Sequence, residues 1–318
     1  MPALYLTEAD VRHLVDMRTA IESVRRAFEA LGEGQAENMP RRRVAAPGLI
    51  LHNMHAAAGY LGVAGAKVYS TTRAAAVFHL LLYDAAGGRL LAMIEADHLG
   101  RLRTGAASGV ATELMARPEA STVGLFGTGR QAQTQLEAVC AVRRVSRVDV
   151  FGRDADRCAE FADEMAGSLG VEVAPALRPD LAVMEKDVVI TATSAKTPLF
   201  DARLLGDGTH LNVIGSNFLH KAEIDVETVR RADVIVCDSI DACRLEAGDF
   251  VAAIEAGVTC YENMHELADV VAGRAPGRAR TEDVTLFKSV GLAIEDVALG
   301  HEVLRRARAA GIGQELPA

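Results

Sequence analysis

The pattern of hydrophobic and polar positions changes along the chain and separates two regions. The first region opens on an amphipathic stretch of helical period from Thr7 to Leu31, where Thr7 and Asp10 form a capping-box signal. From Asn38 to Ile94 short apolar runs alternate with polar positions, which predicts strands. The expected strands are Arg43–Ala46, Ile50–Met54, Ala64–Tyr69, Val77–Asp84 and Arg89–Ile94.

A hairpin and a helix close this region. The turn Ala85–Gly88 lies between the last two expected strands and contains the glycines that hairpin turns favour. A helix is expected from Arg103 to Met115, and Arg117 with Pro118 ends the first half of the chain.

The second region, from Ser121 to about Val284, alternates strand-like and helix-like segments. Such alternation implies a parallel sheet with helices on both faces. A final helical stretch, Leu292–Ala309, is apolar on one face and returns to the first half. The strands expected in the second region are Thr122–Phe126, Val148–Phe151, Val171–Ala174, Asp187–Thr191, His210–Ile214 and Asp233–Cys237.

These patterns predict an α/β protein of two domains. Residues 119–291 are expected to form a Rossmann-type, doubly wound parallel sheet that binds a dinucleotide. Residues 1–118 and 292–318 are expected to form an α+β domain for substrate binding and dimerisation. The exposed sheet of that domain would suit an interface between two copies, so we expect a homodimer.

Composition agrees with a cytoplasmic enzyme. The 318 residues suffice for two domains, and although half of them are hydrophobic, no apolar run of about 18 residues could span a bilayer. Lys plus Arg is 34 against 43 acids, a net charge of −9, which argues against a nucleic-acid binder. The N-terminus lacks the features of a signal peptide, and the five scattered cysteines have no metal-binding spacing, which suits a reducing cytoplasm.

Residues 121–132, S-T-V-G-L-F-G-T-G-R-Q-A, carry the most informative motif. An apolar strand leads into Gly127-x-Gly129-x-x-Ala132, and a helical pattern follows. Gly127 permits a tight turn, Gly129 lets the backbone approach a pyrophosphate, and Ala132 allows the helix to pack near the strand. The free N–H groups of the helix N-terminus favour an anion. An accidental glycine turn can carry the same letters, but the surrounding strand and helix favour a dinucleotide site.

The end of the next strand bears on the choice between NADP(H) and NAD(H). An NAD site places an acid there for the ribose hydroxyls, whereas this chain reads Gly152-Arg153-Asp154, with Arg157 further on. A glycine leaves room for a 2′-phosphate, and a guanidinium can donate to it. NADP(H) is therefore favoured and NAD(H) remains possible, since Asp154 could still bind the ribose and the arginines could be solvated.

Five ordered blocks of the sequence carry a resemblance to a known family. The blocks are G-A-K-V-Y at 65–69, L-R-T-G-A-A-S at 102–108, G-T-G-R-Q-A at 127–132, V-I-G-S-N-x-x-x-K-A-E-I-D at 213–225 and T-L-F-K-S-V-G-L-A-I-E-D at 285–296. On these blocks, which together are far more specific than any single motif, the sequence resembles the ornithine cyclodeaminase/mu-crystallin family over nearly its whole length. The resemblance implies a nicotinamide cofactor and a small amino or imino acid as the substrate. The family includes cyclodeaminases, alanine dehydrogenases, ketimine reductases and a hormone-binding crystallin, so the fold does not choose the reaction.

The resemblance implies that Lys67 lies beside the substrate carboxylate and that Arg103 also binds the substrate. Lys67 stands in the apolar run V-A-G-A-K-V, and a buried lysine needs an anion, although a solvent-facing strand lysine is the alternative. Arg103 is expected to open a helix, where the dipole disfavours a cation, so it indicates a ligand anion unless it pairs with Glu95 or Asp97.

A further family arginine precedes the first hairpin, and Arg41, Arg42 and Arg43 compete for that role. Arg41 and Arg43 share one face of a strand, and spacing to Pro47 weakly favours Arg43.

The resemblance also assigns the cofactor contacts. Thr104 would approach a cofactor phosphate, while Thr193, Ser289 and Val290 would line the nicotinamide side, where Val290 would also touch the substrate. The full set of expected cofactor residues is Arg103, Thr104, Gly127, Gly129, Arg130, Gln131, Ala132, Arg153, Asp154, Thr193, Val213, Ile214, Lys221 and Ser289.

Asn217 is the position that discriminates between reactions. Cyclodeaminases of the family carry an aspartate at this turn as acid and base, but an asparagine exchanges no proton near neutral pH. We therefore expect Lys67 and Asn217 to be catalytic in the reduction of a C=N bond, with the proton supplied by Lys67, His220 or water. The acidic run Glu223, Asp225 and Glu227 is interpreted as a solvated first turn of a helix.

The expected function is NAD(P)H-dependent reduction of a small 2-imino carboxylate, cyclic or open-chain, to the amino acid. The alternatives are an alanine-type dehydrogenase, a cyclodeaminase-like ammonia lyase and a non-catalytic NADP(H)-dependent binding protein. No metal site is expected, because His52 and His55 would face opposite sides of a strand.

Overall fold

The computed structural model describes residues 2–317. It divides into two compact units, one made of residues up to Thr104 together with those from Gly291 onward, the other of Gly105–Val290. The first boundary between the units lies between residues 104 and 105, inside helix α3 (Asp97–Met115). The predicted boundaries, after residues 118 and 291, would place the whole of this helix in the first domain. Each unit is described below by itself.

Two helices begin the first unit where a single amphipathic helix was expected. They are α1 (Glu8–Leu14) and α2 (Met17–Gly32). The predicted capping box is confirmed, because Thr7 and Asp10 bond each other's backbone N–H groups. The break between the helices occurs at Asp16, whose side chain accepts a hydrogen bond from the N–H of Thr19 and so starts a new helix.

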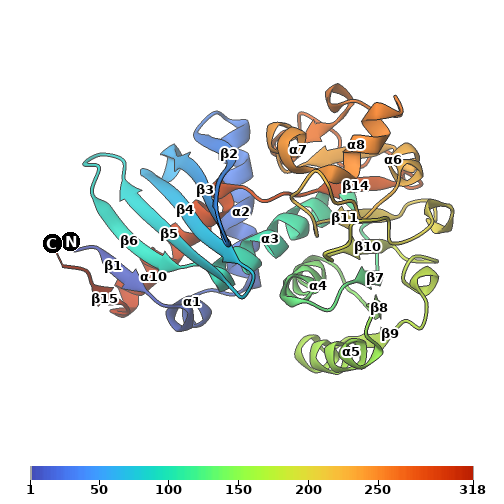
Figure 1. Ribbon diagram of the computed structural model, residues 1–318, viewed down its shortest axis with the longest axis horizontal. Helices are drawn as coiled ribbons and strands as arrows, with labels where there is room; N and C mark the ends of the chain where they lie inside the picture. The colour runs from blue at the N-terminus through green and yellow to red at the C-terminus, as the bar shows by residue number, and fades with distance from the viewer. Residues whose placement is uncertain (1, 318) are drawn as a thin grey trace. The chain divides into compact units, whose positions relative to one another are not determined.

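A seven-stranded mixed sheet forms the centre of the first unit, in the order β15-β1-β6-β5-β4-β3-β2 (Figure 1). The five expected strands and the hairpin after Asp84 are confirmed, and most of the strands are longer than expected. Two short strands, β15 at the edge of the sheet and β1 beside it, were not expected. The strands are β1 (Leu4–Leu6), β2 (Ala36–Ala46), β3 (Leu49–Ala58), β4 (Val63–Thr72), β5 (Ala76–Asp84), β6 (Leu90–Glu95) and β15 (Gln314–Glu315).

Helix α10 (Ala293–Ala310) packs against β3, β4, β5 and α2, as its apolar face predicted (Figure 1). Glycines permit the close approach. A Cβ on Gly65 of β4 would lie 2.6 Å from Val297, and one on Gly300 would lie 2.3 Å from Leu80. The C-terminal helix is thus fitted tightly onto the sheet that comes first in the sequence.

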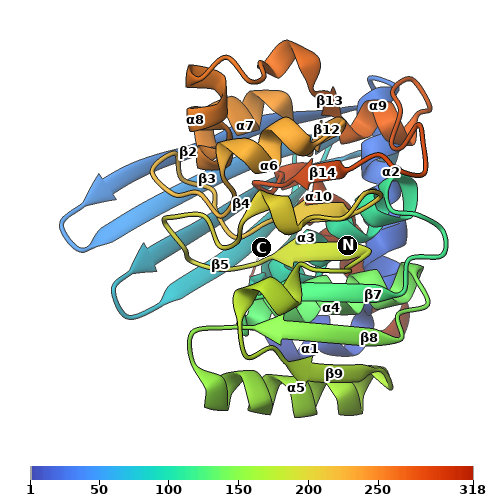
Figure 2. The ribbon, with the colours of Figure 1, turned by 90° about the vertical axis from the view of Figure 1, so that its right-hand side faces the viewer.

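The second unit is built on an eight-stranded sheet in the order β13-β12-β14-β11-β10-β7-β8-β9. Every pair in it is parallel, which confirms the Rossmann-type prediction; Figure 2 shows β7, β8 and β9 side by side. The sequence pattern missed β13 and the fully buried β14. The strands are β7 (Thr122–Phe126), β8 (Arg147–Phe151), β9 (Glu172–Pro175), β10 (Val188–Thr191), β11 (His210–Val213), β12 (Val234–Cys237), β13 (His265–Glu266) and β14 (Thr285–Lys288).

Helices connect these strands, and buried side chains of α4, α5 and the sheet form a core around Leu125, Leu136 and Val150. The 3-10 turns of the chain are η1 (Gly59–Leu61), η2 (Pro179–Ala182), η3 (Ala202–Leu204) and η4 (Tyr261–Asn263). The helices of this unit besides α3 are α4 (Arg130–Val142), α5 (Ala155–Leu169), α6 (Val226–Arg231), α7 (Ile240–Glu246), α8 (Gly248–Glu255) and α9 (Leu267–Val271).

Within residues 2–317, no helix has the length and apolarity needed to cross a membrane. The five cysteines are free thiols, and the expected reducing cytoplasm stays a prediction.

Candidate active site

The predicted glycine turn joins β7 to α4 in the second unit. Gly127 has a φ of 111°, and a Cβ there would lie 2.5 Å from the carbonyl oxygen of Ala192, so a side chain does not fit. Gly129 is the N-cap of α4, and among the described residues no side chain caps this helix N-terminus. A Cβ on Gly129 would meet none of the described atoms within 4 Å. The first turn of α4, which contains Arg130, Gln131 and the buried Ala132, therefore begins at a glycine with open space beside it, and a helix N-terminus favours an anion.

A cavity of about 1000 Å³ lies over this turn. Its lining comes from the carboxyl ends of β7, β8 and β10. From β7 the chain runs through β8 to β9 on one side, and it then crosses back to β10 on the other side of β7. That switch of strand order is where open parallel sheets bind nucleotides. The open glycine turn and the uncapped helix fit a dinucleotide. The lining residues are Phe126–Gly129, Phe151–Asp154, Arg157 and Ala192–Leu199.

The carboxyl end of β8 gives this cavity a basic wall. Arg153 and Arg157 both line the cavity and are exposed. The Asp154 carboxylate caps α5 by accepting a hydrogen bond of 3.1 Å from the N–H of Arg157. Gly152 is tightly enclosed, because a Cβ there would lie 2.9 Å from the sulfur of Cys158. Two arginines and one acid thus line this part of the cavity, and the acid also caps a helix.

The expected nicotinamide-side residues lie on neighbouring loops of the same unit. Thr193 lines the cavity, Val213 ends β11, and Ile214 follows it. Ser289 and Val290 follow β14 and are held by buried Asp238, whose Oδ2 accepts from the Ser289 hydroxyl and the Val290 N–H at 2.8 Å each. Sequence reasoning missed Asp238.

The loop after β11 carries Asn217, which is half-buried. Lys221 lies over the Phe218 ring at 5.1 Å, and His220 is exposed. The interpretation of the acidic run is wrong for Glu223, which is fully buried, although Asp225 does cap α6. Glu223 precedes the helix and accepts hydrogen bonds from neighbouring loops, so it is not part of a solvated turn.

The first unit contains a buried cluster of charges around Lys67. Lys67 of β4 is 3% exposed, and its Nζ lies 2.7 Å from Oδ1 of Asp296 in the first turn of α10. Arg103 bonds the same oxygen at 3.2 Å and Oε2 of Glu295 at 2.8 Å. Sequence reasoning missed both acids, because they lie far from Lys67 and Arg103 along the chain.

Burial and neighbouring charges shift the pKa values of Lys67 and Arg103 in this cluster. Burial lowers the pKa of Lys67 to about 8, although the Asp296 carboxylate opposes the shift. For Arg103, burial acts to lower the pKa, but the carboxylates of Asp296 and Glu295 outweigh it and raise the pKa. Lys67 is therefore a lysine that exchanges its proton near physiological pH.

Arg103 does not open a helix, and that expectation is wrong. Helix α3 begins at Asp97, so Arg103 lies in its second turn, and its partners are Glu295 and Asp296. The sequence prediction missed the start of the helix, residues 97–102, although Asp97 is an acid of the kind that helix N-termini favour. Thr104 follows on α3 and donates its hydroxyl to the carbonyl oxygen of Gly100 at 2.7 Å.

Of the competing arginines, Arg41 lies in the cluster. Arg41 is buried, acts electrostatically on Lys67, and donates to the carbonyl oxygen of Gly291 at 3.4 Å. Arg43 is half-buried and donates instead to the ring of His52 at 3.2 Å. Arg41, Lys67 and Arg103 are thus buried in one cluster, in which the carboxylates of Glu295 and Asp296 pair with Lys67 and Arg103. Buried cations of this kind provide charged donors for an anion.

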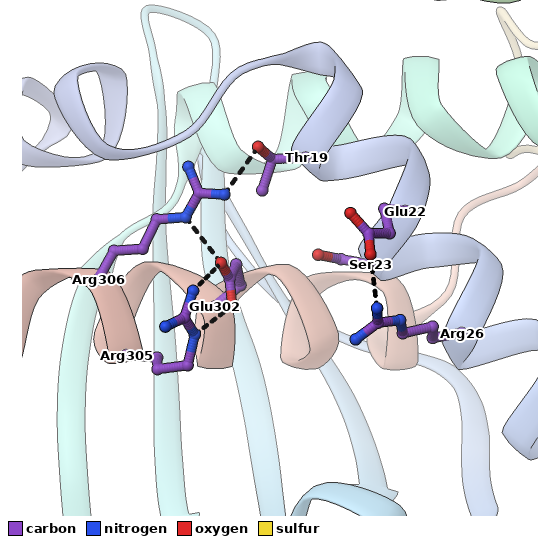
Figure 3. Close-up of a pocket in the computed structure, with 7 residues that line it drawn as sticks. All are labelled: Thr19, Glu22, Ser23, Arg26, Glu302, Arg305 and Arg306. Carbon is purple, nitrogen blue, oxygen red and sulfur yellow. Dashed lines mark hydrogen bonds and ion pairs between the residues drawn. The ribbon is translucent and has the colours of Figure 1, made fainter.

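A second cavity of the first unit, of about 320 Å³, lies between α2 and α10 (Figure 3). Its guanidinium groups are paired: Arg26 with Glu22, and Arg305 and Arg306 with Glu302. These pairs are more exposed to solvent than the Lys67–Asp296 pair, so water and salt screen their charges more strongly. Over residues 2–317, no group of three or more His, Cys, Asp or Glu side chains is arranged to hold a metal ion.

An open dinucleotide-type cavity in one unit and a buried cation cluster in the other define a nicotinamide-dependent oxidoreductase. The ornithine cyclodeaminase/mu-crystallin family model matches residues 2–311, and the chain belongs to this family. The expectation drawn from the five sequence blocks is thereby confirmed.

Among named proteins, this chain is more similar to reductases and dehydrogenases than to cyclodeaminases. The Delta(1)-pyrroline-2-carboxylate reductase of Bacillus cereus is 34% identical over 238 residues, which cover 74% of this chain and 73% of the relative. The structure of the Thermococcus litoralis Delta(1)-pyrroline-2-carboxylate reductase, in complex with NADH and L-proline, has a TM-score of 0.93 at 33% identity and covers 98% of this chain and 100% of that one. An archaeal alanine dehydrogenase dimer with bound NAD has a TM-score of 0.94 at 30% identity and covers 100% and 99%.

Proposed function

We propose that this oxidoreductase reduces a small 2-imino carboxylate, such as a cyclic ketimine of the pyrroline- or piperideine-2-carboxylate type, to the corresponding amino acid. It acts on a C–N bond with a nicotinamide dinucleotide. Similarity to reductases of Delta(1)-pyrroline-2-carboxylate over three quarters of the chain or more supports the choice of a cyclic imine.

The observation that carries this proposal is the burial of three cations, Arg41, Lys67 and Arg103, in one cluster. These side chains bind the substrate carboxylate, because each offers a charged donor to an anion. Burial strengthens this attraction, since little water screens it. A carboxylate fixed by several donors also holds the adjacent imine carbon in one orientation.

The bound dinucleotide supplies the hydride that reduces the imine carbon. The chain's own residues then have to provide one proton and stabilise charge. Lys67 is the proposed proton source, because its pKa of about 8 leaves it largely protonated at neutral pH and able to give the proton up. Exposed His220 and water are the alternative donors.

Asn217 supports reduction over loss of ammonia. Its amide can donate and accept hydrogen bonds and so orient an imine or a water, but it cannot act as a general base near neutral pH. A cyclodeaminase reaction needs such a base, whereas reduction of a preformed imine does not. We place Asn217 beside the reacting C–N group.

NADP(H) is the proposed cofactor. Arg153 and Arg157 line the cavity at the end of β8, and Asp154, which could otherwise bind a ribose hydroxyl, caps α5. Two guanidinium groups favour a 2′-phosphate. The related structures named above contain NADH or NAD, so the preference is a property proposed for this chain.

We further propose that the protein is a homodimer. Exposed apolar side chains gather on β2, β3 and β5 of the first unit, among them Val44 and Val77 with 62% and 52% of their surfaces exposed. Exposed apolar side chains on a sheet can be covered by a second copy of the chain. The archaeal alanine dehydrogenase is a dimer, and light scattering tests this proposal.

An alanine-type dehydrogenase is the second candidate. The archaeal alanine dehydrogenase structure matches the whole of this chain, and its reaction would use the same carboxylate clamp on an open-chain imine. The two candidates differ in whether the imine is preformed in a ring or arises from a 2-oxo acid and ammonia.

The deciding experiment is anaerobic incubation with NADPH or NADH and a panel of cyclic imino acids, and of 2-oxo acids with ammonia, followed at the nicotinamide absorbance. Lys67→Ala serves as the control that loses turnover and keeps nucleotide binding. We expect oxidation of NADPH with at least one cyclic imine. Oxidation only with 2-oxo acids and ammonia would favour the second candidate, and no oxidation with any substrate would favour a binding protein.

A further inference from the structure

We infer that Glu223 is a positioning residue that sets the shape of the dinucleotide cavity by holding both ends of the loop 193–199. This loop forms one wall of the cavity. Glu223 itself does not line the cavity and is fully buried behind it. The inference rests on the nucleotide-binding part of the proposed function and is independent of the substrate.

The Glu223 carboxylate accepts four hydrogen bonds from two loops. Oε1 accepts from the N–H and the hydroxyl of Thr193, at 2.7 and 2.6 Å. Oε2 accepts from the Thr191 hydroxyl at 2.8 Å and from the N–H of Gly215 at 2.7 Å. One side chain thus ties the end of β10 and the start of the cavity loop to the turn that follows β11.

The backbone of the same residue holds the other end of the loop. The carbonyl oxygen of Glu223 accepts from the N–H of Leu199 at 2.9 Å. Within the loop, the Thr193 hydroxyl also accepts from the N–H of Ala195 at 3.1 Å. Both ends of the wall are therefore fixed to one residue, and its first residues are fixed to each other.

A carboxylate is required at this position because all four partners donate. An amide of the same shape would place its NH2 group against at least one N–H donor. Gly215 also has to be glycine here, since a Cβ would lie 2.3 Å from Oε1 of Glu223. The four donors therefore require a side chain that only accepts hydrogen bonds. The close approach of Gly215 also leaves no space for the loop to rearrange around a different side chain.

A buried ion pair supports Glu223 from the opposite side. The N–H of Glu223 donates to Oδ1 of Asp249 at 2.6 Å, and Oδ2 of Asp249 lies 2.8 Å from Nζ of Lys288. Lys288 also donates to the carbonyl oxygen of Ser216 at 2.9 Å, next to Asn217. The ammonium group of Lys288 offsets part of the cost of burying the Asp249 and Glu223 carboxylates, although burial still raises the pKa of Glu223. The network thus extends from the nucleotide wall to the turn that carries Asn217.

The test compares Glu223→Gln with Asp225→Asn, using the dissociation constant for NADPH and the Tm of each protein. Asp225 caps α6 two residues away and accepts from the N–H and the hydroxyl of Thr228, so its loss also costs stability but touches no part of the cavity. We expect Glu223→Gln to weaken NADPH binding by at least about tenfold, as for a lost hydrogen bond to a charged group. Asp225→Asn should lower the Tm and leave the dissociation constant within about twofold.

A second variant keeps the test decisive if Glu223→Gln does not fold. Thr191→Val is isosteric, buried and outside the cavity, and it removes one of the four donors. It should weaken NADPH binding by about threefold or more. Unchanged affinity in either folded variant would overturn the inference, because a merely structural role lowers the Tm alone. Failure of the wild-type protein to bind any nicotinamide dinucleotide would instead reject the proposed function.

Discussion

Nζ of Lys67 and Oδ1 of Asp296 are 2.7 Å apart and almost inaccessible to water, yet the same carboxylate oxygen also binds Arg103. One carboxylate therefore serves two cations. Burial dominates the titration of Lys67 and holds its pKa at about 8 rather than near that of a free lysine. Asp296 thus raises the pKa of a lysine that we propose to bind the substrate.

Asp296→Asn should shift the pH dependence of turnover. If kcat/KM requires protonated Lys67, wild-type activity falls as the pH rises through about 8. Asp296 raises the pKa of Lys67, so its neutralisation moves this fall to lower pH, by at least about one unit. The measurement is the pH profile of kcat/KM. Glu295→Gln is the control, because Glu295 binds Arg103 and a smaller shift is expected. A profile unchanged in Asp296→Asn would show that Lys67 does not titrate in the reaction.

Arg41→Ala should raise the KM for the imino acid by about tenfold or more, since it removes one buried cation from the carboxylate site. Arg43→Ala is the matched control on the same strand, two residues away and directed toward His52. Its KM should stay within about threefold of the wild-type value. The measurement is the KM of both variants in steady-state kinetics with the best substrate. A larger increase in Arg43→Ala than in Arg41→Ala would assign the carboxylate-binding role to Arg43.

Arg153→Ala should weaken NADPH binding by at least about tenfold and change NADH binding little, because only NADPH carries the 2′-phosphate. Fluorescence titration of both nucleotides measures this. A wild-type protein that binds NADH as tightly as NADPH would contradict the proposed preference. Gly152→Asp should shift the preference toward NADH, but it is best made together with Cys158→Ala, since the new Cβ would lie 2.9 Å from the Cys158 sulfur.

The unmodified protein should release negligible ammonia from ornithine, because Asn217 offers no exchangeable proton. Asn217→Asp restores a group that can exchange protons and should allow a trace of ornithine cyclisation. Ammonia release and the nicotinamide absorbance are measured together. Robust release by the wild-type protein with no net change in nicotinamide redox state would overturn the assignment of a reductase.

His210 should make the second unit less stable in mild acid. Burial lowers its pKa to about 3, so between about pH 6.5 and 3 the unfolded chain binds a proton that the native protein does not. The free energy of unfolding therefore falls as the pH falls below 6.5, by up to about 2 kcal/mol at pH 5 from this group. Urea unfolding at pH 7 and pH 5 measures it. The pH dependence should be smaller in His210→Gln, and equal slopes in both proteins would exclude this origin.

Local patterns predicted the parallel sheet, the glycine turn and the helix that returns to the first unit. They failed where a tertiary contact decided the outcome. Strand β14 is buried on both faces and ends in Lys288, so it has no alternation to recognise. Helix α3 begins six residues before Arg103, and its first turn contains Gly100, which lowers the helical signal of residues 97–102. The partners of Lys67 and Arg103 lie 229 and 192 or 193 positions away, beyond any local pattern.

The order of the chain also bears on the order of folding. Lys67 and Arg103 belong to the first third of the sequence, but the carboxylates that neutralise them lie on α10, at positions 295 and 296. Burying two cations without their partners would cost several kcal/mol. During synthesis, the sheet of the first unit therefore has to wait for a helix near the end of the chain, while residues 105–290 already hold all the strands of the parallel sheet. The unit that emerges first is thus expected to complete its fold last.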